Sequence, residues 1–248
     1  MMTITPRSRA RSGADFPGNL TTVVFELLTV VDEKGTIAAE TADVFGRSGL
    51  DRHAAEKTAE RWVSEMTAFA DDVRLRREPW RTSDELRREA LFESLDPGER
   101  EALGERAIAA LALVGHRLRP WPDAVAAVNT LADGFTVVAL TDANLSQAVD
   151  LCCAAGLRWH CLLVADSVRT FRPDPAMYRL ATERLQLDPV HTLYASAQPW
   201  DLDVAAEHGY RTAFVRRPGA AEPDDRDEFD LRVGDLAELA KSLLGTMR

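Results

Sequence analysis

Polar and charged side chains stand directly after several of the short apolar runs of this sequence. Glu26 follows a β-branched and aromatic run at 21–25, and Thr141 and Asp142 follow a second run at 135–140. In parallel sheets the reactive groups gather at the carboxyl ends of the strands. Later segments add further polar residues to the same predicted edge: Arg172, Ser196, Gln198 and Asp201. These residues are therefore the candidates for catalysis or binding.

Each candidate also has an ordinary structural explanation. Glu26 could act as a binding or acid–base carboxylate, as a nucleophile, or as a purely structural ion-pair partner of Arg172. The hydroxyl of Thr141 is equally suited to capping a backbone amide. Asp201 begins a helical segment, where negative charge is favoured and capping is common, and Trp200 beside it is expected in the core. The sequence leaves these alternatives open.

The elements that must position the candidates differ between the two halves of the chain. After the first run, about 80 residues show helical periodicity and no convincing strand; one helix face carries Ala55, Ala59, Trp62, Met66 and Phe69. Three residues are the expected N-caps of helices in this block: Asp51, Ser83 and Asp96. This block predicts an all-helical unit.

The second half alternates between apolar runs and helical patterns. Strands are expected at 135–140, 161–164, 192–195 and 212–215, and helices at 122–132, 146–155, 175–185, 201–208 and 233–244. Strands that alternate with helices predict a parallel sheet covered on both faces. We therefore predict an α/β fold with a Rossmann-like core over 20–35 and 120–248, an inserted helical cap over 36–119, and a disordered tail over 1–19.

Composition narrows the classes of partner and the cellular location. The net charge of −10 argues against a nucleic-acid surface and against an anionic membrane. Three cysteines clustered at 152, 153 and 161 do not make a disulfide framework, which favours the cytoplasm. No apolar stretch approaches the ~18 residues of a membrane span. The sequence also lacks the Gly-x-Ser-x-Gly elbow of serine hydrolases and the Gly-x-Gly-x-x-Gly turn of dinucleotide-binding proteins.

Four segments of the chain carry a family resemblance. They are Val-Val-Phe-Glu-Leu-Leu-Thr-Val-Val-Asp at 23–32, Ala-Leu-Thr-Asp-Ala-Asn at 139–144, Val-Arg-Thr-Phe-Arg-Pro-Asp-Pro at 168–175 with Tyr178, and Tyr-Ala-Ser-Ala-Gln-Pro-Trp-Asp at 194–201. Over about residues 21–217 the chain resembles the haloacid dehalogenase superfamily, and most closely its type II 2-haloacid dehalogenases. The resemblance implies a parallel core with an inserted cap, a metal-independent hydrolase with no cofactor, a small organic acid as substrate, and a homodimer.

The resemblance also implies which residues act. In that family a carboxylate at the end of the first strand attacks the substrate carbon, displaces halide and forms an ester that water hydrolyses. The positions that match the catalytic residues are Glu26, Thr141, Arg172 and Asp201. The positions that match the substrate-binding residues are Thr29, Asn144, Tyr178, Ser196 and Gln198.

The sequence departs from the family pattern at the chemical positions. Glu26 replaces the Asp nucleophile, and the loop after it is one residue shorter and lacks its Gly. Arg172 replaces the family's Lys; the lysines of this chain stand at positions 34, 57 and 241, far from that motif. Gln198 replaces Asn, and the position of the cap-helix Arg falls on Val63, with Arg61 close to it. We therefore expect altered chemistry, with a repurposed or non-hydrolytic protein (a binding protein or an acid–base rearrangement enzyme) as the alternative.

A magnesium-dependent phosphatase of the same superfamily is a further alternative that the sequence disfavours. Such enzymes hold Mg²⁺ with the first carboxylate and a second one two residues later, because this ion requires oxygen ligands in octahedral geometry. Here the second position is Leu28. No metal site is therefore expected.

Overall fold

The strand that ends in Glu26 lies in the middle of a six-stranded parallel sheet. The computed structural model describes residues 19–245, and within them the strand order is β5-β4-β1-β6-β7-β8. The strands are β1 (Thr22–Glu26), β4 (Thr136–Thr141), β5 (Cys161–Val164), β6 (Thr192–Ser196), β7 (Arg211–Val215) and β8 (Leu231–Val233). Because β4 and β6 flank β1 in parallel, Glu26, Thr141 and Ser196 end at the same edge.

Alternate residues of β1 face two different layers of helices, as the pleat of a strand requires. The core helices are α5 (Ala124–Leu131), α6 (Leu145–Ala155), α7 (Pro175–Leu185), α8 (Pro199–Glu207) and α9 (Leu236–Gly245). Val23 and Phe25 pack with α5 and α9, whereas Val24 packs with α7 and α8. The side chain of Glu26 therefore belongs to the face that α7 and α8 cover.

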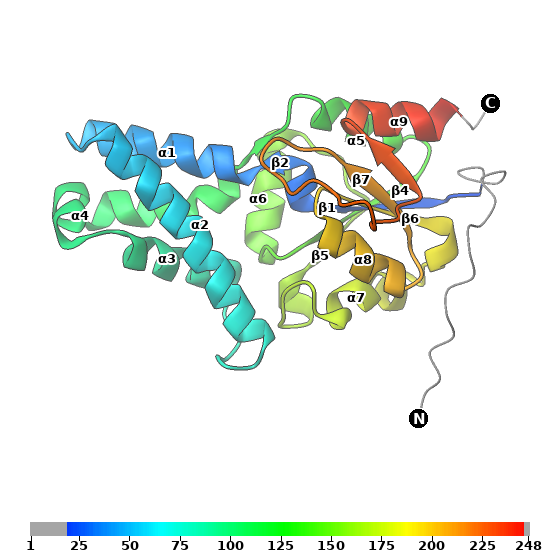
Figure 1. Cartoon of the computed structure of the whole chain (residues 1–248), viewed down its shortest axis with the longest axis horizontal. Coiled ribbons are helices and arrows are strands. Elements are labelled where there is room, and N and C mark those ends of the chain that lie inside the picture. Colours follow the sequence, from blue (N-terminus) through cyan, green and yellow to red (C-terminus); the bar gives the residue numbers. More distant parts are fainter. Residues whose placement is uncertain (1–18, 246–248) are drawn as a thin grey trace.

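The first four α-helices after β1 form the cap. They are α1 (Glu33–Arg47), α2 (Arg52–Arg74), α3 (Ser83–Ser94) and α4 (Pro97–Ala112). Figure 1 shows them gathered at one end of the molecule, beside the sheet and its helices. The chain enters and leaves the cap through the antiparallel pair β2 (Val31–Asp32) and β3 (Arg119–Pro120). The predicted fold class, a parallel α/β core with an inserted helical cap, is confirmed.

Short 3₁₀ turns connect several of these elements: η1 (Leu27–Thr29), η2 (Leu113–Arg117), η3 (Ala165–Ser167) and η4 (Pro189–His191). Of the tail predicted over 1–19, residues 1–18 lie outside the described residues. Within 19–245, none of the helices is long and apolar enough to cross a membrane.

Of the three residues predicted to be helix N-caps, two are confirmed and one is wrong. Asp51 accepts hydrogen bonds from the first amides of α2, and Asp96 starts α4 just before Pro97. Thr82, not Ser83, caps α3, because Glu85 three residues later completes a reciprocal capping box. Ser83 is thereby left free to bond across to the core.

The structure also differs from the sequence predictions at the start of α8. This helix begins at Pro199, two residues earlier than predicted, because proline is well suited to the first helical position. Trp200 then lies on the outer side of the first turn with 44 % of its surface exposed. The prediction that Trp200 is in the core is therefore wrong.

Candidate active site

The carboxylate of Glu26 turns back onto the residues that follow it. Oε1 accepts from the amide of Leu28 at 2.8 Å and from Nη2 of Arg172 at 3.0 Å. Oε2 accepts from the amide of Thr29 at 2.9 Å and from its hydroxyl at 3.1 Å. A carboxylate offers about four lone-pair positions. These four donors therefore occupy its acceptor capacity.

Local sequence explains this conformation. Glu26 has extended backbone angles and is the N-cap of the 3₁₀ turn η1, whose first amides point back at the strand end. Capping residues are normally short, but the extra methylene of Glu lets the carboxylate fold over the shortened loop and reach the amides two and three residues ahead. The missing residue and the longer side chain thus act together. They place the carboxylate over its own turn.

Arg172 is the centre of the site. It lies between η3 and α7, and its side chain is only 3 % exposed. Nη1 contacts Asp201 at 2.9 Å, and Nη2 contacts both Glu26 and Asp142 at 3.0 Å. The backbone amide of Arg172 also donates to Asp142 at 3.0 Å. One guanidinium therefore joins the ends of β1 and β4 and the start of α8.

Asp201 is completely buried and has a separate set of partners. Besides Arg172, it accepts a short hydrogen bond from the hydroxyl of Tyr178 and bonds at 3.2 and 3.3 Å from the hydroxyl of Tyr194. The backbone amides of α8 donate no hydrogen bond to this carboxylate. Of the two roles left open by the sequence, capping is therefore excluded in this conformation, and Asp201 is an ion-pair residue of the site.

Burial and neighbouring charges shift the acidity of the whole cluster. Burial raises the pKa of Glu26 to about 7, with smaller increases from Asp201 and Asp142, against the opposing effect of Arg172. Burial lowers the pKa of Arg172, but the three carboxylates outweigh it and hold this pKa above its usual range. Burial, chiefly, also raises the pKa of Tyr178 far above its usual value. The guanidinium is thus a permanent cation, while Glu26 can exchange a proton near neutral pH.

The predicted site residues divide into two groups. Glu26, Arg172, Asp201, Tyr178 and Thr29 belong to one hydrogen-bonded network, which Thr29 extends by accepting from the amide of Ala197 at 2.8 Å. Four others lie at the same edge with different partners.

The hydroxyls among these four cap local turns. Thr141 accepts from the amide of Ala143 at 3.1 Å, which confirms the capping role left open for it, and Ser196 accepts from the amide of Gln198 at 3.1 Å. Gln198 itself is half-buried at the N-cap of α8.

Asn144 contributes to the seam between cap and core. Its backbone amide and its Oδ1 contact the hydroxyl of Ser83 at 3.0 and 2.7 Å, and its Nδ2 donates to Asp84 at 3.0 Å. Nearby, His116 bridges Asp84 of the cap and Asp150 of α6 at 3.0 and 2.8 Å. Asn144 thus joins the core to the cap.

Two cluster members were not assigned to the site by the resemblance. Asp142 follows β4 directly, and its strand-end position was the available signal. Tyr194 lies within an apolar strand, two residues before Ser196 and therefore on the same face of the sheet. Its contact with Asp201 is seen only in the structure. In the cap, Val63 is partly buried and packs against the apolar core of the helices, and nearby Arg61 pairs with Glu99 at 3.8 Å.

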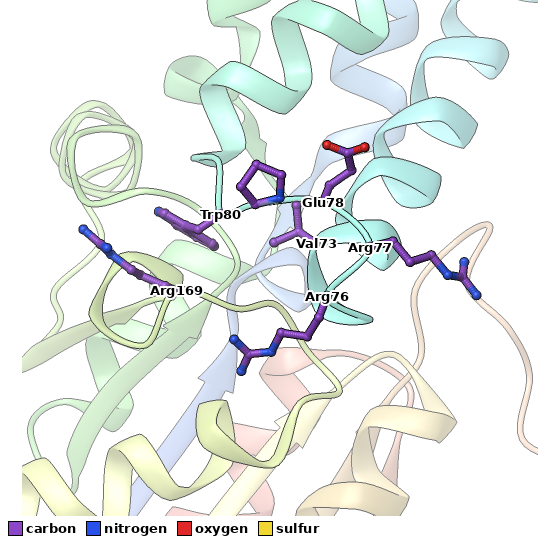
Figure 2. A pocket seen from close by; sticks show the side chains of 7 residues that line it. Val73, Arg76, Arg77, Glu78, Trp80 and Arg169 are labelled. Carbon is purple, nitrogen blue, oxygen red and sulfur yellow. The ribbon is translucent and has the colours of Figure 1, made fainter.

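A hollow of about 390 Å³ opens where the cap meets the core, beside the loop that precedes Arg172. It is lined by Val73, Arg76, Arg77, Glu78, Pro79, Trp80 and Arg169. Figure 2 shows Arg77 and Glu78 directed away from the loop that carries Arg169, whereas Arg76 extends from the cap loop towards the core. The rings of Trp80 and Phe171 pack together, with their centroids 5.0 Å apart. The hollow is thus connected to Arg172 through its neighbour in the chain.

Within residues 19–245 there is no group of three or more His, Cys, Asp or Glu side chains arranged to hold a metal ion. The carboxylates at the site converge instead on a guanidinium, which takes the central position.

A model of the family described as haloacid dehalogenase-like hydrolase matches residues 20–209. The chain belongs to this family. It is 28 % identical over 142 residues to (S)-2-haloacid dehalogenase 1 of Pseudomonas sp. (strain CBS-3), a match that covers 52 % of this chain and 58 % of that protein. It is also 28 % identical over 173 residues to (S)-2-haloacid dehalogenase 4A of Burkholderia cepacia, covering 64 % and 68 %. Haloacid dehalogenase-like membership, predicted from the four motifs, is confirmed.

Solved structures extend the similarity to the whole fold. A defluorinating L-2-haloacid dehalogenase superposes with a TM-score of 0.83 at 29 % identity, covering 92 % of this chain and 98 % of that one. A second L-2-haloacid dehalogenase superposes with a TM-score of 0.82 at 30 % identity, covering 91 % and 99 %. The similarity thus includes both the core and the cap of this haloacid dehalogenase-like protein.

Proposed function

We propose that this protein is a metal-independent hydrolase of the 2-haloacid dehalogenase type that acts on a small organic acid between core and cap. The observation that carries the proposal is the buried Arg172, held by carboxylates at the carboxyl ends of the central strands, where α/β proteins of this kind bind ligands. Its relatives carry the names of enzymes that act on 2-haloacids. A cytoplasmic homodimer is part of the same proposal.

The hollow beside the cap supports an anionic substrate. Of its three lining arginines, Arg77 is paired with Asp72 at 3.2 Å, so Arg76 and Arg169, against Glu78, leave the hollow with a small positive excess in a chain with a net charge of −10. Positive clefts raise the local concentration of anions and speed their association. An organic acid approaching the seam between cap and core would be attracted there.

The reaction differs from the family's usual one, in which the carboxylate at the end of the first strand, here Glu26, attacks the substrate. Glu26 is 1 % exposed, and its four acceptor positions are filled, so an attack through its oxygens would first require breaking hydrogen bonds to its own turn or to Arg172. Each bond to a buried carboxylate is a charge-assisted one. This is a physical reason to assign Glu26 the role of holding the site together.

The proposal is tested by incubating the protein with chloro-, bromo- and fluoro-substituted 2-haloacids and measuring halide and 2-hydroxy acid together. We expect equal amounts of both products, unaffected by a chelator. Arg172→Met should lower the rate at least about 10²-fold, because the electrostatic anchor is lost. Asp133→Asn, which removes one charge from an exposed pair with Arg158, is the matched control. Silence of the wild type across the panel would contradict the proposal.

The saturated carboxylate of Glu26 also favours a second candidate, a non-hydrolytic binding protein or acid–base rearrangement enzyme. Calorimetric titration with the same acids distinguishes the two. Heat of binding without release of halide would support the second candidate and exclude hydrolysis of that acid.

A further inference from the structure

The three carboxylates that contact Arg172 within the described residues differ in their access to solvent. The side chains of Glu26 and Asp201 are 1 % and 0 % exposed, whereas that of Asp142 is 34 % exposed. A carboxylate that reacts with a diffusing substrate must be reachable from outside. Asp142 is reachable in the arrangement that the structure shows.

The hydrogen bonds of the cluster point the same way. Each oxygen of Asp142 accepts one bond from Arg172, the first from the backbone amide and the second from Nη2. Two of its about four acceptor positions are therefore used. In Glu26 the corresponding positions are filled, and Asp201 is shared among Arg172, Tyr178 and Tyr194. Asp142 therefore keeps unshared electron pairs and is partly exposed.

Asp142 lies at the same chemical centre as Glu26. Their oxygens share one nitrogen, Nη2 of Arg172, at 3.0 Å each, so they are no more than about 6 Å apart. The residue stands on the turn at the end of β4, next to β1, where the hydroxyl of Thr141 caps the amide of Ala143. The turn and the bidentate contact with Arg172 together orient its carboxylate.

We propose that Asp142 is the carboxylate that reacts with the substrate, and that Glu26 is a positioning residue which holds Arg172. This assignment rests on the proposed hydrolase function. One oxygen of Asp142 attacks C2 of the 2-haloacid, a carbon–oxygen bond forms, and the carbon–halogen bond breaks so that halide leaves with the electron pair. Water then attacks the carbonyl carbon of the Asp142 ester, releasing 2-hydroxy acid, the free carboxylate and one proton.

A single turnover in ¹⁸O-labelled water tests the assignment on the unmodified protein. Excess enzyme is reacted with one 2-haloacid that it hydrolyses, and peptide fragmentation then locates the label. Hydrolysis of an enzyme ester leaves one ¹⁸O in the carboxylate that attacked, because water enters at the ester carbonyl. We expect the label at Asp142. Label at Glu26, or labelled product with unlabelled protein, would overturn the assignment while leaving the hydrolase function intact.

Substitution supplies an independent measurement. Asp142→Asn keeps the size of the side chain and should lower kcat at least about 10³-fold, as loss of a reacting group does, with an unchanged circular dichroism spectrum. Asp133→Asn removes the carboxylate of an exposed ion pair with Arg158, just after α5, and should keep wild-type kcat. An Asp142→Asn protein with kcat near that of Asp133→Asn would overturn the assignment. Absence of turnover by the wild type would overturn the proposed function and the assignment with it.

Discussion

The buried carboxyl of Glu26 makes the stability of the fold depend on pH in an unusual direction. Its pKa rises from the usual 4.5 to about 7 because burial penalises the charged form. The folded protein therefore binds the proton more tightly than the unfolded chain. The resulting stabilisation is complete below pH 4.5 and is lost as the pH rises through about 7. A tenfold change in proton affinity is worth about 1.4 kcal/mol, so the loss is on the order of 3 kcal/mol.

Urea unfolding of wild type and Glu26→Gln at several pH values between 4.5 and 8 measures this contribution. Gln has nearly the same shape and no proton to bind, so other titrating groups cancel in the difference between the two proteins. We expect the free energy of unfolding of the wild type, relative to Glu26→Gln, to fall by about 3 kcal/mol across this range. A difference that is constant with pH, or one that increases, would refute the reasoning that burial outweighs Arg172.

Three further predictions concern the seam between cap and core. Burial lowers the pKa of His116, but its hydrogen bonds to Asp150 and Asp84 outweigh this and raise it. His116 should therefore stabilise the contact between cap and core below pH 6.5 and lose that effect as the pH rises through its raised pKa; His116→Gln should abolish this dependence in hydrogen exchange of α3. Gly115→Ala would bring a Cβ to 2.5 Å from a glutamine side chain of α6 and should lower the free energy of unfolding by about 1–3 kcal/mol in urea titrations. Arg169→Met should raise KM for an organic anion several-fold at low salt and little at high salt, because exposed charges are screened; a salt-independent KM would contradict the role of the hollow.

Much of the architecture follows from local sequence patterns. The short apolar run at 161–164 predicts a strand, and the proline after Asp174 predicts the start of a helix over 175–185; both have the observed bounds. Alternation of strands and helices was sufficient for the parallel sheet. The helix expected over 233–244 begins only at Leu236, because Val233 ends the strand β8; three residues at a sheet edge have no periodicity of their own that could predict this strand.

The candidate site was predictable only in its location. Glu26, Thr141 and Ser196 lie at one edge of the sheet whatever their side-chain conformations, because parallel strands end at the same edge. The sequence could not show that Arg172 reaches three carboxylates at once or that Tyr194 faces Asp201. These contacts depend on side-chain conformations that the packing of α7 and α8 selects.

The sequence by itself determined that the chain is a haloacid dehalogenase-like protein with an altered set of charged groups, since three lysines far from the third motif exclude the family's usual cation. The tertiary structure decided how the replacements are used. Glu26 folds onto its own turn, while Asp142, which also contacts Arg172, stays 34 % exposed. The physical reason is that burial, and the one bond to Glu26 that comes from Arg172, arise from elements distant in the chain, so residue type alone cannot reveal which carboxylate remains exposed.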